Sequence, residues 1–308
     1  MSRVITVEGE DRRGLPSTAL GINAPSWVKG HPLAAFFVLA FVLTWSVEIP
    51  ARLFADQIGV LQIVVGWLPG LAALIAAGLT VGLPGQSAWL ARGFIGRVGR
   101  RWYFIALFGA LPIWLGALAL DRYFGGSGIP SVDLLNTDVV ALIAPVIGNF
   151  VVYLVLSTEE LAWRGFALPR LQARRGALVA SLIIGVVSAI WYLPSVIFDA
   201  TTSIEAEIAF FVGTIALSVV YGWIFNNTRG SVLLCGLAHA ATNTWTDVIS
   251  APPADHVLSQ WIYTALLLAV AAIIAIIFGP SRLSRRPAGE IPLEPKPSPV
   301  RKVLKALP

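Results

Sequence analysis

The chain has 308 residues, of which 56% are hydrophobic and only 13% charged, and its mean hydropathy is +0.77. Soluble domains carry about 25% charged residues, so this composition excludes a soluble globular protein. The single Cys excludes a disulfide framework. The net charge of +5 does not indicate a nucleic-acid partner, because basic residues in so hydrophobic a chain typically mark cytoplasmic loops.

Uncharged apolar runs follow one another along the chain, and each reaches or approaches the roughly 20 residues that cross a bilayer as a helix. The eight runs are Gly30–Val47, Gln57–Ala91, Trp102–Leu120, Val139–Thr158, Gly176–Phe198, Ile208–Thr228, Gly230–Thr246 and Val257–Ser281. Their continuous apolar character disfavours membrane strands, which alternate polar and apolar residues. The sequence therefore predicts an all-α, polytopic membrane protein with eight transmembrane helices.

The basic residues predict how these helices are oriented in the cell membrane. With a cytoplasmic N-terminus, 20 of the 22 Lys and Arg residues lie inside, and only Arg52 and Arg122 lie outside. The positive-inside tendency therefore predicts that both termini are cytoplasmic. We expect a cytoplasmic tail over residues 1–29 and a transmembrane domain over 30–281. Residues 282–308 are basic and Pro-rich without apolar periodicity, and are predicted to be a disordered tail near anionic lipid.

Ionisable residues at membrane depth are costly, so each one is a candidate functional residue. The first group, Glu159, Glu160 and Arg164, continues the fourth run without a helix breaker before Gly165. The sequence predicts one helix to about Pro169, with both Glu side chains roughly 15 Å inside its end. Glu160 and Arg164 are four residues apart and are expected to form an ion pair.

Glu159 points to a different face of that helix and has no partner at helical spacing. We expect it to be free to bind a cation or to act as a general base. The alternative is that the segment is simply the cytoplasmic end of a helix, with both Glu side chains solvated.

The second group is His239 and Asn243, which lie four residues apart on one face of the seventh run. His239 is roughly 14 Å from the predicted cytoplasmic end of that helix, so its depth matches that of Glu159. A lone intramembrane His is often only a hydrogen-bonding residue. A Glu, a His and an Asn at equal depth, however, are suited to hold a divalent metal with an open position for water.

These residues resemble the motifs of the CAAX prenyl protease and bacteriocin-processing family of intramembrane metalloproteases (the CPBP or ABI family). The first family motif, Glu-Glu-x-x-x-Arg, matches Glu159, Glu160 and Arg164, and the last, a His followed four residues later by Asn, matches His239 and Asn243. The resemblance covers roughly residues 30 to 280. It implies that the eight helices form a CAAX-protease-like bundle.

The resemblance also implies roles for these residues. Glu159 would activate a water bound to zinc or another divalent metal and would help to bind that metal. His239 and Asn243 would hold the metal or the oxyanion. Glu160 and Arg164 would brace the catalytic site. The implied activity is a metal-dependent endopeptidase that cleaves a membrane-associated or lipid-modified peptide near the cytoplasmic leaflet of the bilayer.

The middle family motif departs from the pattern, because Trp-His-Leu-Pro is here Trp191-Tyr192-Leu193-Pro194. A phenol with a pKa of about 10 is a poor ligand unless the metal deprotonates it, so metal binding is expected to be weak or absent. Tyr192 either binds as a phenolate or donates to the oxyanion while water or Cys235 completes the metal site. Otherwise the chain is a non-catalytic relative, acting as a binding or immunity-type membrane protein. A small-solute transporter is disfavoured by the absence of inverted repeats.

Overall fold

The computed structural model describes residues 25–54, 59–126, 139–156, 158–198, 202–249, 256–291 and 293, and over these ranges the regular structure is helical, without a strand. The longer helices are α2 (Pro32–Phe54), α3 (Gly59–Leu90), α5 (Ala110–Tyr123), α6 (Val139–Leu156), α8 (Ala177–Trp191), α10 (Ile204–Asn227), α11 (Val232–Val248) and α12 (His256–Phe278). The shorter ones are α1 (Ser26–Gly30), η1 (Ala91–Phe94), α4 (Arg100–Phe108), η2 (Leu161–Ala167), α7 (Leu168–Arg175), α9 (Leu193–Ile197) and η4 (Ala288–Glu290).

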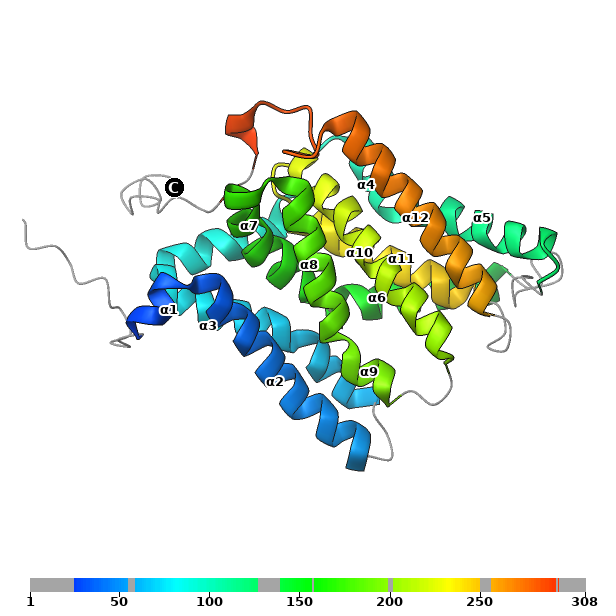
Figure 1. Cartoon of the computed structure of the whole chain (residues 1–308), viewed down its shortest axis with the longest axis horizontal. Coiled ribbons are helices and arrows are strands. Elements are labelled where there is room, and N and C mark those ends of the chain that lie inside the picture. The colour runs from blue at the N-terminus through cyan, green and yellow to red at the C-terminus, as the bar shows by residue number, and fades with distance from the viewer. Residues whose placement is uncertain are drawn as a thin grey trace, which may run out of the picture.

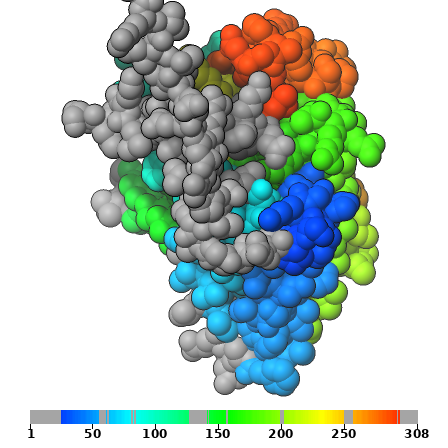
Figure 2. Space-filling view, turned by 90° about the vertical axis from the view of Figure 1, so that its left-hand side faces the viewer, coloured from blue at the N-terminus to red at the C-terminus, as the bar shows by residue number. Residues whose placement is uncertain are grey.

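The helices pack as a bundle in which α10 contacts both α8 and α12, while α2 pairs with α3 (Figure 1). The contact between α8 and α10 is close because of Gly185, where a Cβ atom would lie 2.7 Å from the Cα of Ile215. Small residues permit such backbone approach between membrane helices. In Figure 2 the C-terminal part of the chain (orange) lies above the N-terminal helices (blue).

Five helical segments are long and apolar enough to cross a membrane: Pro32–Phe54, Ile63–Thr80, Arg100–Tyr123, Ile204–Asn227 and Val257–Phe278. The apolar segments Ile143–Val155 and Ala177–Trp191 are shorter. Each lies at a predicted apolar run, and the remaining run forms α11. The prediction of an all-α polytopic membrane protein is thereby confirmed. The number of eight spans and the cytoplasmic placement of the termini stay predictions.

Helix α2 continues beyond the predicted end of the first span at Val47. The residues that ended the apolar run, Glu48 and Arg52, form an ion pair with 3.0 Å between Oε1 and Nε, and both side chains are largely buried. Because the pair neutralises both charges, the helix accommodates them. The segment that the charge pattern placed in an outer loop is therefore helical.

Residues 279–291, which we call the C-terminal strap, fold back onto the ends of α8 and α10. The backbone N–H groups of Ala177 and Leu178 donate to the carbonyls of Ser281 and Pro280, both at 2.9 Å. The Leu283 side chain is completely buried, and its carbonyl accepts a 2.9 Å hydrogen bond from Asn227. The first residues after the predicted domain boundary at residue 281 therefore contact the bundle, and the boundary itself stays a prediction. Residues 294–308 of the predicted tail lie outside the described residues.

The strap also leads back toward the motif segment through Arg92, in η1. Its guanidinium donates to the carbonyl of Leu293 at 2.7 Å and to that of Gly165 at 3.4 Å. Burial, together with the nearby charge of Arg170, lowers the pKa of Arg92 to about 10. A buried cation thus joins the chain just after the strap to the helix that carries Glu160.

Candidate active site

The first motif begins a new helix and does not continue the fourth span. α6 ends at Leu156, and Thr158, which is not helical, precedes the helical turn that starts at Glu159. The Thr158 N–H donates to the carbonyl of Gly66 at 3.2 Å, and its side chain fills the space beside Gly70 of α3. The predicted continuous helix is therefore wrong, because Thr158 bonds to the backbone of α3 and interrupts it.

The motif then passes through a π-helical turn, η2, in which Ala162 to Ala167 are buried. The wider turn is supported from α3, since the indole N–H of Trp89 donates to the carbonyl of Leu161 at 2.8 Å. A Cβ at Gly165 would lie 2.9 Å from that indole nitrogen, so the turn packs directly on Trp89. π-helical turns are rare and are often found at functional sites.

Glu160 is the centre of a buried polar network. Its Oε1 accepts from Arg164 Nη1 at 2.9 Å and lies 3.1 Å from Nδ1 of His239. The predicted ion pair between Glu160 and Arg164 is confirmed. The ring of Tyr221 supports both partners: the Arg164 guanidinium lies 4.9 Å from its centroid, and the His239 imidazole stacks on it at 5.9 Å.

Tyr221 did not stand out in the sequence, because it lies within an uncharged apolar run and no motif includes it. The contact of His239 with Glu160 was also not predicted, since the matched depths suggested a contact with Glu159. The first and last motifs nevertheless meet in the folded chain.

Glu159 has a partner after all. The Tyr192 hydroxyl donates to Glu159 Oε2 at 2.7 Å, and the Glu159 side chain is only 7% exposed. The expectation that Glu159 is unpartnered was wrong, because helical spacing within one helix cannot reveal a partner just after the end of α8. The Tyr192 ring packs between Trp191 and Phe210, with ring centroids 4.8 and 5.4 Å away. The structure thus brings the first and middle motifs into contact.

Two hydrogen bonds with residues of α2 hold the middle motif in place, and the sequence predicted neither. The Ser195 hydroxyl donates to Glu48 Oε1 at 2.6 Å, which ties α9 to α2. The Trp45 indole N–H donates to the carbonyl of Trp191 at 3.1 Å. The only signal in the sequence was the charge of Glu48, directly after the first apolar run.

Asn243 lies one turn beyond His239 on α11 and is partly buried. Its backbone carbonyl accepts from the Thr246 hydroxyl at 3.0 Å, and within the described ranges its side chain makes no hydrogen bond. The amide is therefore available on the His239 face, as the four-residue spacing predicts.

The His, Cys, Asp and Glu side chains of the described residues do not by themselves form a metal centre with three protein ligands. In the part of the chain that the structure describes, no three His, Cys, Asp or Glu side chains are grouped so as to hold a metal ion. The carboxylate of Glu160 is bound by Arg164 and His239, and that of Glu159 by Tyr192. The fully buried Cys235 thiol contacts the Tyr221 carbonyl at 3.6 Å. Zinc or another divalent metal stays a prediction.

Comparison with known proteins matches the region that contains all three motifs. Residues 135–245 match the family model for type II CAAX prenyl endopeptidase Rce1-like proteins. Over 166 residues the chain is 24% identical to CAAX prenyl protease 2 of Methanococcus maripaludis, an alignment that covers 52% of this chain and 56% of that relative. The chain therefore spans just over half the length of this curated relative. Over the segment that carries the three motifs, the chain is therefore similar to CAAX prenyl protease-related membrane proteins.

Proposed function

We propose that the chain is an intramembrane endopeptidase that cleaves a membrane-associated or lipid-modified peptide near the cytoplasmic leaflet, with Glu159 as its general base. The observation that carries the proposal is that two adjacent buried carboxylates have different partners. Glu160 is neutralised by Arg164. Glu159 accepts a hydrogen bond from the Tyr192 hydroxyl and forms no ion pair with the described residues, so its carboxylate is the one proposed to transfer the proton.

In the proposed reaction, Glu159 takes a proton from a water molecule while the water oxygen attacks the scissile carbonyl carbon. The carbonyl oxygen becomes an oxyanion, which the free edge of His239 and the Asn243 amide are placed on one helix face to stabilise. As the C–N bond breaks, Glu159 returns its proton to the leaving amine. The proposed step uses the protonated imidazole of His239: its Nδ1–H donates to Glu160, which positions the ring, and its Nε2–H donates to the oxyanion.

A divalent metal is the alternative form of this proposal, with His239, Asn243 and Glu159 as its ligands. Such an ion would supply Lewis-acid activation of water. No step above depends on it. Metal analysis of the purified protein tests this form directly.

The second candidate function is a non-catalytic binding or immunity-type membrane protein. The observation that favours it is the Tyr192–Glu159 hydrogen bond, because a phenol that donates to the base occupies an acceptor position that a water molecule needs. Such a protein would bind the peptide in the same site without cutting it.

The test uses the full chain in proteoliposomes with a farnesylated peptide that ends in a CAAX sequence. We expect Glu159→Gln to reduce cleavage by about 100-fold or more, the usual loss for a general base. Glu205→Gln, at an exposed acid in the first turn of α10, is the matched control and should cleave normally. Normal cleavage by Glu159→Gln overturns the proposed role, and peptide binding without any cleavage by the parent chain favours the non-catalytic function.

A further inference from the structure

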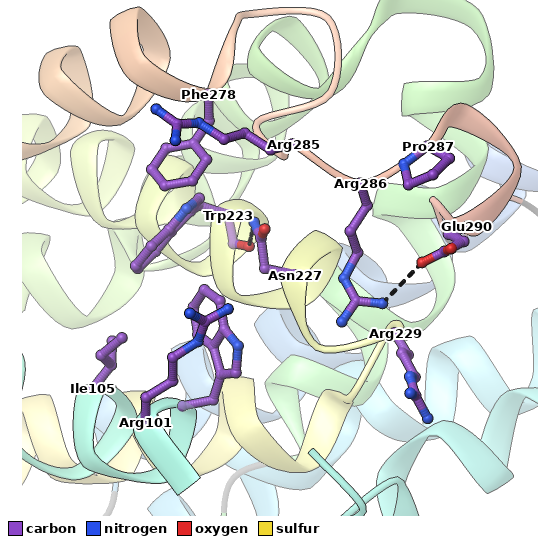
Figure 3. Close-up of a pocket in the computed structure, with 11 residues that line it drawn as sticks. Arg101, Ile105, Trp223, Asn227, Arg229, Phe278, Arg285, Arg286, Pro287 and Glu290 are labelled. Carbon is purple, nitrogen blue, oxygen red and sulfur yellow. Dashed lines mark hydrogen bonds and ion pairs between the residues drawn. The ribbon is translucent and has the colours of Figure 1, made fainter. Parts of the chain in front are cut away.

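A second site lies away from the motif residues, where the ends of α10 and α12 meet the start of α4 and the C-terminal strap. It is a pocket of about 730 Å³ (Figure 3). Its lining includes four arginines, Arg101, Arg229, Arg285 and Arg286, which come from three separate parts of the chain. In Figure 3 they surround an open space at the ends of these helices.

The pocket has an excess of positive charge. Its lining contains one acid, Glu290, which pairs with Arg286 at 3.2 Å. Arg101, Arg229 and Arg285 form no ion pair with the described residues, and all three are exposed. Guanidinium groups bind phosphate through paired hydrogen bonds, so the open charges suit a phosphate group.

The remaining wall of the pocket is aromatic. Trp223 contacts Trp102 at 4.8 Å and Phe278 at 5.5 Å between ring centroids. On the same helices, α4 and α12, Phe104 is 68% exposed and Ile276 is 81% exposed. Apolar side chains so exposed on membrane helices face acyl chains. The pocket therefore joins an arginine cluster to a surface that suits lipid.

The fold holds the arginines in place before any ligand binds. In the strap, Leu283 is buried with a left-handed backbone (φ +47°), and the Ser284 hydroxyl donates to the Asn227 side chain at 3.0 Å. These contacts fix the backbone just before Arg285. Arg229 itself has φ +59°, a conformation that glycine adopts without strain, so this turn keeps an arginine at the expense of backbone strain.

We propose that this pocket binds the phosphate of an anionic phospholipid, with the arginines at the headgroup and the aromatic side chains against the glycerol and upper acyl carbons. A free phosphate ion shares the headgroup chemistry. The lipid is favoured because the aromatic wall and the exposed apolar faces beside it have no role in binding a small anion. The inference does not rest on the proposed peptidase function.

The experiment measures binding of dioleoylphosphatidylglycerol and dioleoylphosphatidylcholine to the purified full chain in neutral detergent by native mass spectrometry. We expect phosphatidylglycerol to be retained over phosphatidylcholine. Arg101→Gln with Arg285→Gln should weaken phosphatidylglycerol binding about tenfold or more. Arg100→Gln with Arg174→Gln removes two exposed arginines outside the pocket lining and should leave binding unchanged.

Glu290→Gln provides a test that does not depend on a loss of function. It releases Arg286 and should strengthen phosphatidylglycerol binding several-fold. If the double arginine variant fails to fold, the binding of phosphatidylglycerol to Glu290→Gln alone tests the proposal. Binding no stronger than that of the parent chain would overturn it. Equal binding of the two lipids, or equal losses in both double variants, also overturns it. Displacement of the lipid by equimolar inorganic phosphate would identify a free-anion site instead and reject the lipid assignment.

Discussion

The hydroxyl of Tyr192 donates a 2.7 Å hydrogen bond to Oε2 of Glu159, and so joins the end of α8 to the start of the first motif. The residue that departs from the family pattern is therefore in direct contact with the proposed general base. A phenol in this position orients the carboxylate but, unlike an imidazole, has no basic nitrogen to share the proton of an attacking water. The activity of the chain depends on which of these properties matters more.

Tyr192→Phe tests whether the Tyr192 hydroxyl orients the Glu159 carboxylate. If the hydroxyl orients Glu159, its removal should lower cleavage of the farnesylated peptide by about tenfold or more, because a misplaced base loses much of its effect. Rates in proteoliposomes measure this. The Phe ring keeps the packing against Trp191 and Phe210, so an unchanged rate would mean that Tyr192 only fills space.

Tyr192→His is the complementary change, since it restores the family motif. We expect zinc binding, measured by titration of the purified protein, to tighten by about one to two orders of magnitude, a range typical of changes around a metal site. If the His variant binds no more zinc than the parent and cleaves no peptide, both the metal prediction and the peptidase proposal lose their support.

The features that sequence predicts correctly here depend on local spacing. The apolar runs correspond to helices because a helix that crosses a bilayer needs a continuous run of apolar residues, which the sequence shows directly. The Glu160–Arg164 pair follows from a separation of four residues within one helix, and the helical turns around η2 preserve that contact. The family resemblance added the middle motif, which no spacing argument had connected with Glu159.

The features that sequence did not predict depend on contacts between distant residues. Tyr192 and Glu159 are 33 positions apart, and Ser195 and Glu48 are 147 apart. The helix break at Thr158 likewise arises from bonds to α3, although the local sequence favours a continuous helix. The charge pattern also ended the first helix too early, at Val47, because the ion pair between Glu48 and Arg52 lets the helix carry both charges.

The pair formed by Glu160 and Arg164 should behave as a buried ion pair. Arg164→Met alone should lower the free energy of unfolding by about 3 kcal/mol or more, because it leaves a buried carboxylate with only His239. Arg164→Met with Glu160→Gln should cost less. Unfolding in mixed micelles measures both variants. Arg286→Met is the control, because its pair with Glu290 is far more exposed than the Glu160–Arg164 pair and should contribute less than about 1 kcal/mol. Equal losses in the single and double variants would mean that the pair is solvated.

The packing of α8 on α10 should depend on Gly185. Gly185→Ala places a methyl group against the backbone of Ile215 and should cost about 1–3 kcal/mol of unfolding free energy through overpacking. Gly148→Ala, inside α6 with no neighbouring atom within 4 Å, is the matched control. It should be neutral or stabilise by up to about 1 kcal/mol, since Ala is the better helix former. A Gly185 variant as stable as the control would show that the two helices do not approach so closely.

The C-terminal strap should carry the stabilising contacts of the basic tail. Deletion of residues 294–308 keeps every strap contact described above, so the free energy of unfolding should change by less than about 0.5 kcal/mol. Deletion of 282–308 removes the buried Leu283 and the hydrogen bonds of Asn227 to the strap. Leu283→Ala isolates the packing contribution and should cost about 2–5 kcal/mol, as for other buried leucines. Both deletions and the point variant can be compared by unfolding in the same micelles. If deletion of 282–308 is no more harmful than deletion of 294–308, the strap does not stabilise the bundle, and the domain would end where the apolar pattern alone places it, at residue 281.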